Sequence, residues 1–190
     1  MAATQDLSKF TGKEYLALEA VSEVRHEFNG GQILAMAGAE LGHNQIAQNV
    51  RAELTFALRD RPCRILSSDQ RVKVEAIGEY FYPDVLVTCL DPQLVDPRPQ
   101  SLVNPQVIVE ILSETTQAYD RGAKWVAYRM IATLTDYVLV SSVRRELEHY
   151  QRRPDGTWTL QTLVGDGSCT LANEVALELS RLYRLVPGLE

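Results

Sequence analysis

The sequence has few cysteines and no long apolar run, and these two deficits set its first limits. Cys63, Cys89 and Cys169 are widely separated and odd in number, so they predict neither a disulfide framework nor a CxxC metal site. This use of cysteine is typical of a reducing cytoplasm. No apolar run approaches the roughly 20 residues that a membrane-spanning helix needs, and the first residues do not resemble a secretory signal. We therefore expect a cytoplasmic protein with no membrane partner.

Positive charge is also scarce. The 190-residue chain has 19 Lys and Arg against 25 Asp and Glu, which gives a formal net charge of −6. Non-specific binding to nucleic acid depends mainly on Lys and Arg, so this balance argues against tight, constitutive DNA binding. It does not exclude a nuclease, because local basic patches and metal ions can provide the contact with phosphate.

Several motifs of known chemistry are absent from the sequence. It has no HExxH, GxSxG, GxxxxGK[ST] or GxGxxG pattern, which argues against a zinc protease, a serine hydrolase, a P-loop enzyme and a dinucleotide-binding enzyme. Neither Cys63 nor Cys89 has a neighbour in the sequence that could act as a general base for a thiol nucleophile. The chemistry must come from another constellation.

What is present predicts one α/β domain over residues 1–190, with its core at about 11–185. The fold class that we expect is a central mixed β-sheet flanked by helices, with an additional hairpin toward the C-terminus. Thr11 and Glu14 have the spacing of a capping box, and Asn29-Gly30-Gly31 is a hairpin-turn signal. The expected helices are a short one after residue 11 and longer ones at 42–59, 118–131 and 175–184. The expected strands are 25–28, 32–36, 64–66, 71–74, 82–90, 106–112, 137–140, 147–151 and 158–163, with a surface loop at 91–105.

Three charged residues stand in or beside apolar segments between positions 82 and 124. Asp84 precedes one strand-like run, Glu110 lies within a second, and Lys124 lies in the helical pattern that follows. Charges in buried strands are costly unless they are paired or bind a cation. If the two strands are neighbours, Asp84 and Glu110 converge, and a magnesium ion would relieve their repulsion. The alternative is that Asp84 forms a strand-entry turn and that Glu110 pairs with an arginine.

Five stretches then follow one another along residues 15–182: HEFNGGQILAMA, GHNQIAQNV, YPDVLVTC, VIVEILSETT and YDRGAKWVAYR. This succession resembles the Uma-two endonuclease family, which belongs to the PD-(D/E)XK restriction-endonuclease-like superfamily. The resemblance implies that Asp84 and Glu110 bind the metal together with the Ile111 carbonyl. The usual ExK lysine would stand at Leu112, and the resemblance implies that Lys124 replaces it from the following helix.

Other residues have two interpretations each. His43 resembles the family's recurring histidine and would be catalytic, or it is a helix-start or surface histidine. Asp120 would orient Lys124 through an i,i+4 ion pair, and Glu27 is interpreted as a surface strand residue rather than one that reaches the metal through water. The candidates for phosphate contacts are Arg71, Lys73, Arg121 and Arg129, although solvated charged faces explain them equally well. Gln70 and Tyr128 are candidates for the cleft wall, with core packing favoured for Tyr128; Trp125 is interpreted as core, and His26 and His149 as surface residues.

The function that these observations predict is an endonuclease that hydrolyses DNA phosphodiester bonds with water activated by Mg²⁺, or by Mn²⁺ in its place. The resemblance also implies a homodimer. One alternative is a module with the nuclease fold that binds nucleic acid or protein without turnover. A second alternative is a phosphodiesterase that acts on RNA or a small nucleotide.

Overall fold

A computed structural model of the chain describes residues 9–36 and 38–189. Its helical segments are α1 (Gly12–Glu19), α2 (Leu41–Leu58), α3 (Gln117–Tyr119), the π-helical turn η1 (Asp120–Lys124), α4 (Trp125–Tyr128) and α5 (Leu179–Leu182). Sheet A contains, in spatial order, β2 (Gln32–Ala35), β1 (His26–Asn29), β5 (Glu79–Phe81), β4 (Val72–Val74), β8 (Ser101–Leu102) and β7 (Leu94–Val95). Sheet B contains β12 (Trp158–Val164), β11 (Glu146–Arg152), β10 (Asp136–Ser141), β9 (Val107–Leu112), β6 (Val85–Thr88) and β3 (Arg64–Ser67), and a small third sheet pairs β13 (Ser168–Thr170) with β14 (Ala176–Glu178).

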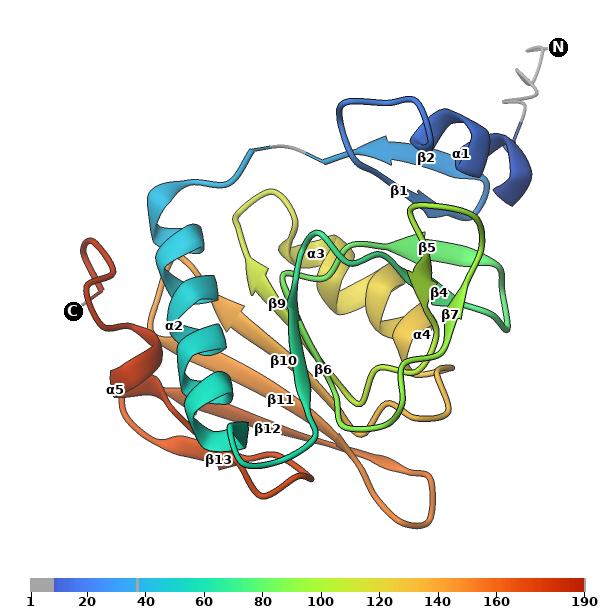
Figure 1. Cartoon of the computed structure of the whole chain (residues 1–190). Coiled ribbons are helices and arrows are strands. Elements are labelled where there is room, and N and C mark those ends of the chain that lie inside the picture. Colours follow the sequence, from blue (N-terminus) through green and yellow to red (C-terminus); the bar gives the residue numbers. More distant parts are fainter. Residues whose placement is uncertain (1–8, 37, 190) are drawn as a thin grey trace, which may run out of the picture.

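Sheet B is the central layer of the molecule. Figure 1 shows α2 on one side of it and the α3–η1–α4 segment on the other. Side chains alternate between the faces of β9: Val107, Val109 and Ile111 pack in the same core cluster as α2, whereas Ile108 and Leu112 pack in the cluster that contains Ala127 and Tyr128 of α4. All six residues of β9 are buried, as expected for a central strand. The mixed α/β fold with helices on the faces of a mixed sheet is confirmed.

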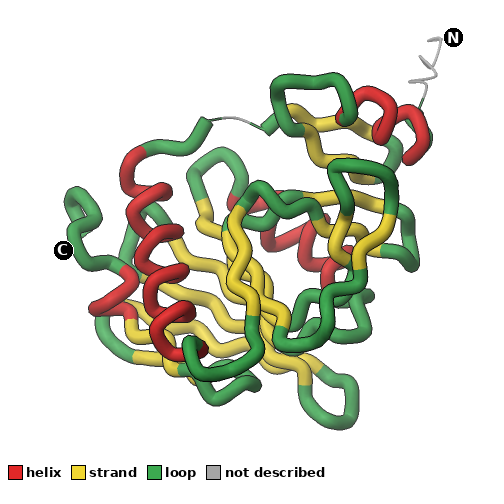
Figure 2. The backbone as a smooth tube through the Cα atoms, viewed as in Figure 1, coloured by secondary structure: helices red, strands yellow, loops and turns green. Residues whose placement is uncertain are grey.

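The strands β9 and β10 pair in parallel, with Glu110 opposite Leu139. A parallel pair needs a crossover connection, and here the crossover contains α3, η1 and α4. This connection lays the helical segment along the face of sheet B on which Glu110 lies. Figure 2 shows the helix passing beside the yellow strands of the sheet.

The segment around Asp84 differs from the prediction. The expected strand 82–90 is present but shorter: β6 covers only Val85–Thr88 in sheet B, and the separate strand β5 ends at Phe81 in sheet A. Pro83 has no backbone N–H for a sheet hydrogen bond, and the chain changes sheets there. The carboxylate of Asp84 therefore stands at the junction of the two sheets, before the strand begins.

Two other expected elements were wrong. The loop predicted at 91–105 contains β7 and β8, and Ser101 and Leu102 are fully buried. The helix predicted at 175–184 begins as strand β14 and is helical only in α5. Its residues Val175, Leu177 and Leu179 are buried, and this spacing of two is the period of a strand rather than of a helix.

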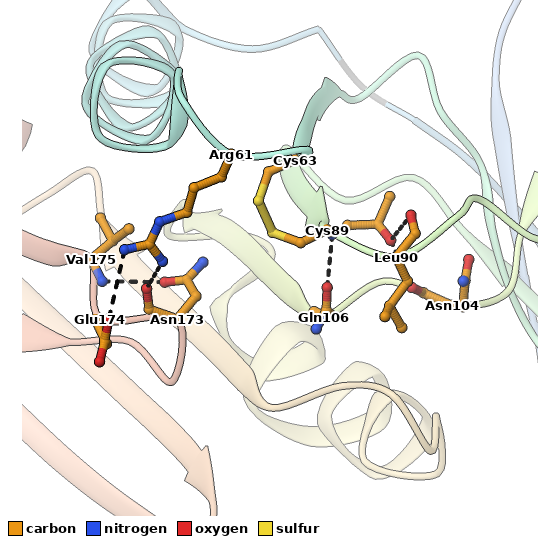
Figure 3. The surroundings of a disulfide bond; sticks show 10 residues. Arg61, Cys63, Cys89, Leu90, Asn104, Gln106, Asn173, Glu174 and Val175 are labelled. Atoms are coloured by element: carbon orange, nitrogen blue, oxygen red, sulfur yellow. Dashed lines mark hydrogen bonds and ion pairs between the residues drawn. A yellow bond between two sulfur atoms is a disulfide. The ribbon is translucent and has the colours of Figure 1, made fainter.

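The prediction for the cysteines was also wrong. Strands β3 and β6 are antiparallel, with Arg64 opposite Thr88, so that the residues just beyond this pair, Cys63 and Cys89, face each other. They form a disulfide (Figure 3). Their separation of 26 residues gave no sign of this pairing, which only the sheet register creates. Cys169 is free and buried.

The capping box predicted at Thr11 is present and begins α1, with both reciprocal hydrogen bonds formed. The hairpin across Asn29-Gly30-Gly31 joins β1 to β2 as expected, and both glycines have positive φ. Through the residues that the structure describes, no helix has the length and apolar character required to cross a membrane.

Candidate active site

A cleft of about 1040 Å³ lies where sheets A and B meet. Its walls come from the β1–β2 hairpin and from the first half of α2, and its floor from the start of β6, the end of β9 and the η1 turn. Acidic side chains outnumber basic ones in it: the acids are Glu23, Glu27, Glu40, Asp69, Asp84, Glu110 and Asp120, and the bases are Arg25, Arg51 and Lys124, with His43 beside them.

Asp84 and Glu110 meet at the floor of this cleft. The Ile111 amide donates to Asp84 Oδ2 at 2.7 Å, and the Asp84 amide is 3.4 Å from Glu110 Oε2. The pairing of β6 with β9 places Val85 opposite Val109, so the next positions in this register are Asp84 and Glu110. The structure thus brings together Asp84, Glu110 and Ile111, the three residues expected to hold the metal.

Glu110 is the more deeply buried of the two acids, at 3% exposed. Its Oε1 accepts hydrogen bonds from Lys124 Nζ and from the Tyr128 hydroxyl, each at 3.0 Å. Burial raises the pKa of Glu110 well above its usual value. The charge of Lys124 opposes this shift, and the carboxylates of Asp120, Asp84 and Glu27 add to it. A cation bound at Glu110 would therefore relieve a carboxylate that is poorly neutralised.

Lys124 reaches this point from the π-helical turn. Asp120 and Lys124 are four residues apart in the π-helical turn, where four residues make slightly less than one full turn. Lys124 and Tyr128 are four residues apart across α4, where four residues make slightly more than one turn of 3.6 residues. The two deviations compensate each other, and Asp120, Lys124 and Tyr128 all face the sheet and are buried. Single π-turns occur frequently at functional sites.

The ammonium of Lys124 has three carboxylate partners. Its Nζ is 3.0 Å from Glu27 Oε1, 3.0 Å from Glu110 Oε1 and 3.3 Å from Asp120 Oδ1. Burial alone would lower the pKa of Lys124, but Glu110, Glu27 and Asp120 raise it well above its usual value, so this amine stays protonated. The predicted i,i+4 pair of Asp120 with Lys124 is present.

Glu27 is a side chain of the cleft that the sequence assigned wrongly. It was expected at the surface of its strand, but it is 5% exposed and also accepts a hydrogen bond from the Tyr82 amide at 3.0 Å. Strand β1 lies inside sheet A, between β2 and β5, and this position buries Glu27 against Lys124. The only sequence signal for Glu27 was its place in HEFNGG, the first of the five stretches.

His43 lies in the first turn of α2, and its Nε2 is 3.2 Å from Asp84 Oδ2. Burial alone would lower the pKa of His43, but the hydrogen bond to Asp84, the charge of Asp84 and the Ile111 backbone raise it. Of its two interpretations, the geometry agrees with a place in the site. A protonated His43 places a positive charge beside Asp84, as Lys124 does beside Glu110.

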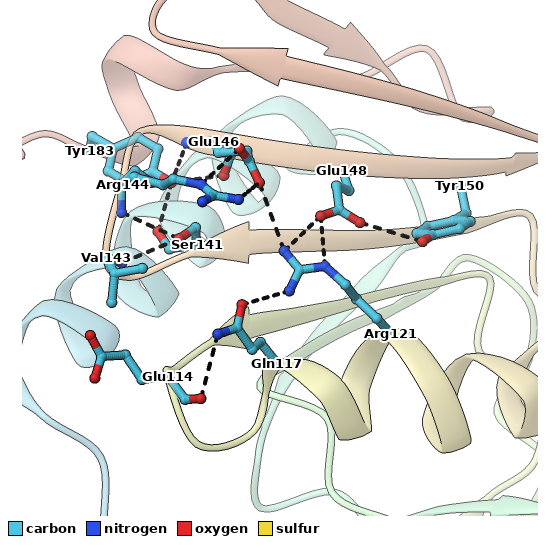
Figure 4. A network of polar contacts seen from close by, with 10 residues as sticks. All are labelled: Glu114, Gln117, Arg121, Ser141, Val143, Arg144, Glu146, Glu148, Tyr150 and Tyr183. Atoms are coloured by element: carbon cyan, nitrogen blue, oxygen red, sulfur yellow. Dashed lines mark hydrogen bonds and ion pairs between the residues drawn. The ribbon is translucent and has the colours of Figure 1, made fainter.

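The predicted phosphate contacts are not in this cleft. Arg71 is 1% exposed and its guanidinium is bonded to Ser101 and Pro99, while Lys73 pairs with Asp96. Arg121 is held on the other side of the helix by Glu146, Glu148 and Gln117 (Figure 4). Arg129 is exposed but does not line the cleft.

Several lesser assignments also change. His149 is not a surface residue: it is 3% exposed, and its Nε2 is 2.7 Å from Asp136 Oδ1. His26 is half-buried and contacts Glu19. Gln70 bonds to backbone carbonyls of Arg71 and Gln100 outside the cleft, Tyr128 is fully buried as expected for a core residue, and Trp125 packs against the same core while remaining partly exposed.

Comparison with known proteins identifies the family of the chain. Residues 13–183 match the family Uma2, described as "Putative restriction endonuclease". The chain belongs to the Uma2 family. Two proteins of Synechocystis sp. (strain ATCC 27184 / PCC 6803 / Kazusa) are similar to it: "Uncharacterized protein sll1609" is 34% identical over 83% of this chain and 89% of its own length, and "Uncharacterized protein slr1290" is 36% identical over 80% of this chain and 79% of its own.

A solved structure shares the fold. It is titled a "putative nuclease belonging to DUF820 from Anabaena variabilis ATCC 29413", and it superposes with a TM-score of 0.75 over 92% of this chain and 98% of its own, at 14% sequence identity. Uma2 membership agrees with a nuclease-like function.

Proposed function

We propose that the protein is a magnesium-dependent endonuclease that hydrolyses phosphodiester bonds of DNA. The observation that carries this proposal is the meeting of Asp84 and Glu110 beside a protonated lysine at the floor of a cleft. Restriction-endonuclease-like membership supports nucleic acid as the class of substrate. The residues assigned to catalysis are Asp84, Glu110, Lys124 and His43.

The donor set fits magnesium. Mg²⁺ usually binds one or two carboxylates and keeps several waters and substrate phosphate oxygens as further ligands. In the described part of the chain, no three side chains of His, Cys, Asp or Glu come together as a metal-ligand group, which suits an ion that needs only two acids better than one that needs a closed set. Asp84, Glu110 and the Ile111 carbonyl would hold it, with Mn²⁺ as a substitute.

The chain's own residues then divide the remaining work. When bound, the metal supplies Lewis-acid activation of a water and stabilises charge on the phosphate oxygens. Lys124 provides a fixed positive charge for the negative charge that develops in the transition state. Asp120 orients this amine from the preceding turn, and His43 holds Asp84 from α2 through its Nε2.

A metal titration combined with a cleavage assay tests the proposal. Calorimetry with Mn²⁺ and cleavage of duplex DNA are measured for the wild type, for Asp84→Asn and for the control Asp60→Asn. Asp60 is an exposed residue just after α2 that does not line the cleft. We expect Asp84→Asn to lose both metal binding and cleavage, and Asp60→Asn to keep both. The proposal is wrong if the wild type neither binds the metal nor cuts any nucleic acid.

A second candidate is a non-catalytic module that keeps the nuclease fold and binds nucleic acid or protein. It is favoured by the excess of acids in the cleft and by the three carboxylates that surround Lys124. The same variants separate the two functions: a binding module retains its partner in Asp84→Asn and never releases cleaved product. Parallel cleavage assays with single-stranded DNA, RNA and small nucleotides decide whether the substrate is DNA or whether the protein is a phosphodiesterase that acts on RNA or a small nucleotide.

We also propose that two copies act together, because one cleft holds one acid pair and a duplex has two strands to cut. Sedimentation of the purified chain with and without DNA measures the stoichiometry, and a monomer under both conditions contradicts this part.

A cytoplasmic location is proposed from the DNA substrate. The Cys63–Cys89 disulfide bears against it, since structural disulfides are rare in the cytosol, and mass spectrometry of alkylated protein from intact cells decides the matter.

A further inference from the structure

Glu27 forms an ion pair with Lys124 from sheet A, whereas the other two carboxylate partners of Lys124 do not belong to that sheet. Glu110 belongs to sheet B, and Asp120 belongs to the same helical segment as Lys124 itself. Glu27 stands on β1 of sheet A, and its Oε1 is 3.0 Å from Lys124 Nζ. The carboxylate of Glu27 therefore links the Lys124 amine to the sheet A wall of the cleft, opposite the helical segment that carries Lys124.

The three contacts of Lys124 are not equivalent. The Lys124 ammonium donates a hydrogen bond to Glu110, and it forms ion pairs with Glu27 at 3.0 Å and with Asp120 at 3.3 Å. Under the proposed function, Glu110 has a metal to bind, and Asp120 moves with the helix because it is only four residues away. The direction of the amine across the cleft therefore depends on Glu27.

Glu27 is itself held firmly. The Tyr82 amide donates to the same Oε1 at 3.0 Å, and Tyr82 is two residues before Asp84. The side chain of Glu27 is 7% exposed, so water competes little for its charge. The backbone that sets the position of Asp84 thus also fixes Glu27, and both acids keep a constant relation to Lys124.

The contacts that the structure gives Glu27 are to hydrogen-bond donors. Its bonded oxygen faces the Lys124 ammonium and the Tyr82 amide, which are both donors. Residues 9–36 and 38–189 contain no group of three His, Cys, Asp or Glu side chains arranged as metal ligands. The contacts of Glu27 are therefore those of a residue that orients a cation of the protein.

We propose that Glu27 is a positioning residue that aims the Lys124 ammonium at the scissile phosphate and that does not bind the metal. This inference rests on the proposed nuclease function. Displacement of a catalytic group by about 1 Å can lower the rate by about 100-fold. Loss of the Glu27 charge leaves Lys124 held by Glu110 and Asp120 alone, which draws the amine toward the helix and the metal ligand.

The test uses Glu27→Gln, which keeps the shape of the side chain and removes its charge. Glu75→Gln is the matched control, because Glu75 is an exposed carboxylate in the β4–β5 turn of the same sheet. Measured are kcat and KM for DNA cleavage, Mn²⁺ affinity by calorimetry, thermal stability, and the NMR signal of the Lys124 ammonium, assigned by its loss in Lys124→Arg.

We expect Glu27→Gln to lower kcat by about 100-fold while KM and Mn²⁺ affinity stay unchanged, and to shift or broaden the ammonium signal. Glu75→Gln should match the wild type in every measurement. A fall in Mn²⁺ affinity would overturn the proposal, because it would make Glu27 a metal ligand, and an unchanged kcat would overturn it as well. If Glu27→Gln does not fold, Glu27→Asp replaces it: lowered kcat with normal metal affinity supports the proposal, and normal kcat contradicts it.

The ammonium signal separates this inference from the proposed function. A wild type that neither binds Mn²⁺ nor cuts nucleic acid contradicts the nuclease proposal, whatever Glu27 does. In that case a signal that changes in Glu27→Gln and not in Glu75→Gln still supports the orienting contact. A signal that is the same in both variants overturns it.

Discussion

The Lys124 ammonium and the Glu110 carboxylate are 3.0 Å apart, and both side chains are almost fully buried. Glu110 stands on the first strand and Lys124 on the helical segment of one β–helix–β crossover, so the connection that creates the parallel β9–β10 pair also brings the amine to the acid. A lysine that lies two residues after the acid on its own strand would need no crossover. Here the position of the ammonium depends on how the helical segment packs on sheet B.

Substitution of Lys124 is expected to destabilise the fold strongly. Lys124→Met removes the ammonium that Glu27, Glu110 and Asp120 share. A buried ion pair that loses one partner typically costs about 3–5 kcal/mol. Urea denaturation at neutral pH measures the loss. Because Glu110 without its lysine partner is the source of this cost, Lys124→Met/Glu110→Gln should recover part of it. A double variant no more stable than the single one would contradict this explanation.

The contact between His43 and Asp84 is expected to make stability depend on pH. The pKa of His43 is raised in the folded protein, so its contribution is fully present below the pKa of the unfolded chain and is lost as pH rises through the folded pKa. An ion pair of this kind contributes about 1 kcal/mol, or a shift in Tm of about 3 °C. The Tm difference between wild type and His43→Asn should therefore be largest in mildly acidic buffer and small in alkaline buffer. A difference that grows with pH would contradict it.

The three cysteines are expected to differ in reactivity. Burial raises the pKa of Cys169 to about 12, with the charge of Asp136 adding to the effect, so little reactive thiolate forms at pH 8. A thiol reagent should find no reactive group in the native protein. In denaturant without reductant it should find one, because Cys63 and Cys89 form a disulfide, and after reduction it should find all three. Three thiols in denaturant before reduction would contradict the disulfide.

Arg51 is expected to contact substrate phosphate. It projects from α2 into the cleft and hydrogen-bonds to Gln48, whereas Arg25, also in the cleft, is paired with Asp69. Arg51→Gln should raise KM and reduce the salt dependence of binding by about one unit of slope, with kcat unchanged. Arg59→Gln at the exposed end of α2 is the control. An unchanged salt dependence in Arg51→Gln would contradict the assignment.

The sequence predicted best where local physics decides the structure. The capping box at Thr11, the hairpin at Gly30 and the buried strand around Glu110 follow from spacing, turn chemistry and continuous apolar character. The i,i+4 pair of Asp120 with Lys124 is local in the same sense. These features involve residues a few positions apart, for which the period of a helix or strand determines which side chains meet.

The sequence failed where the outcome depends on which strands become neighbours. Glu27 is buried because β1 takes an inner place in sheet A, and Cys63 meets Cys89 because β3 pairs with β6. Arg71 was a candidate for phosphate contact until packing buried it beneath Ser101 and Pro99. Each of these depends on contacts across 26 residues or more, which no local period encodes.

By itself, then, the sequence determined the chemical inventory: two acids and a lysine in apolar surroundings, where an isolated charge is costly and must find a partner. Only the tertiary structure decided which partners they have. It placed Asp84 at the junction of two sheets, wound a π-turn that aims Lys124 inward, and brought Glu27 from the other sheet to the same amine. The reason is physical: burial makes pairing necessary, but the docking of sheets and helix determines where each pair forms.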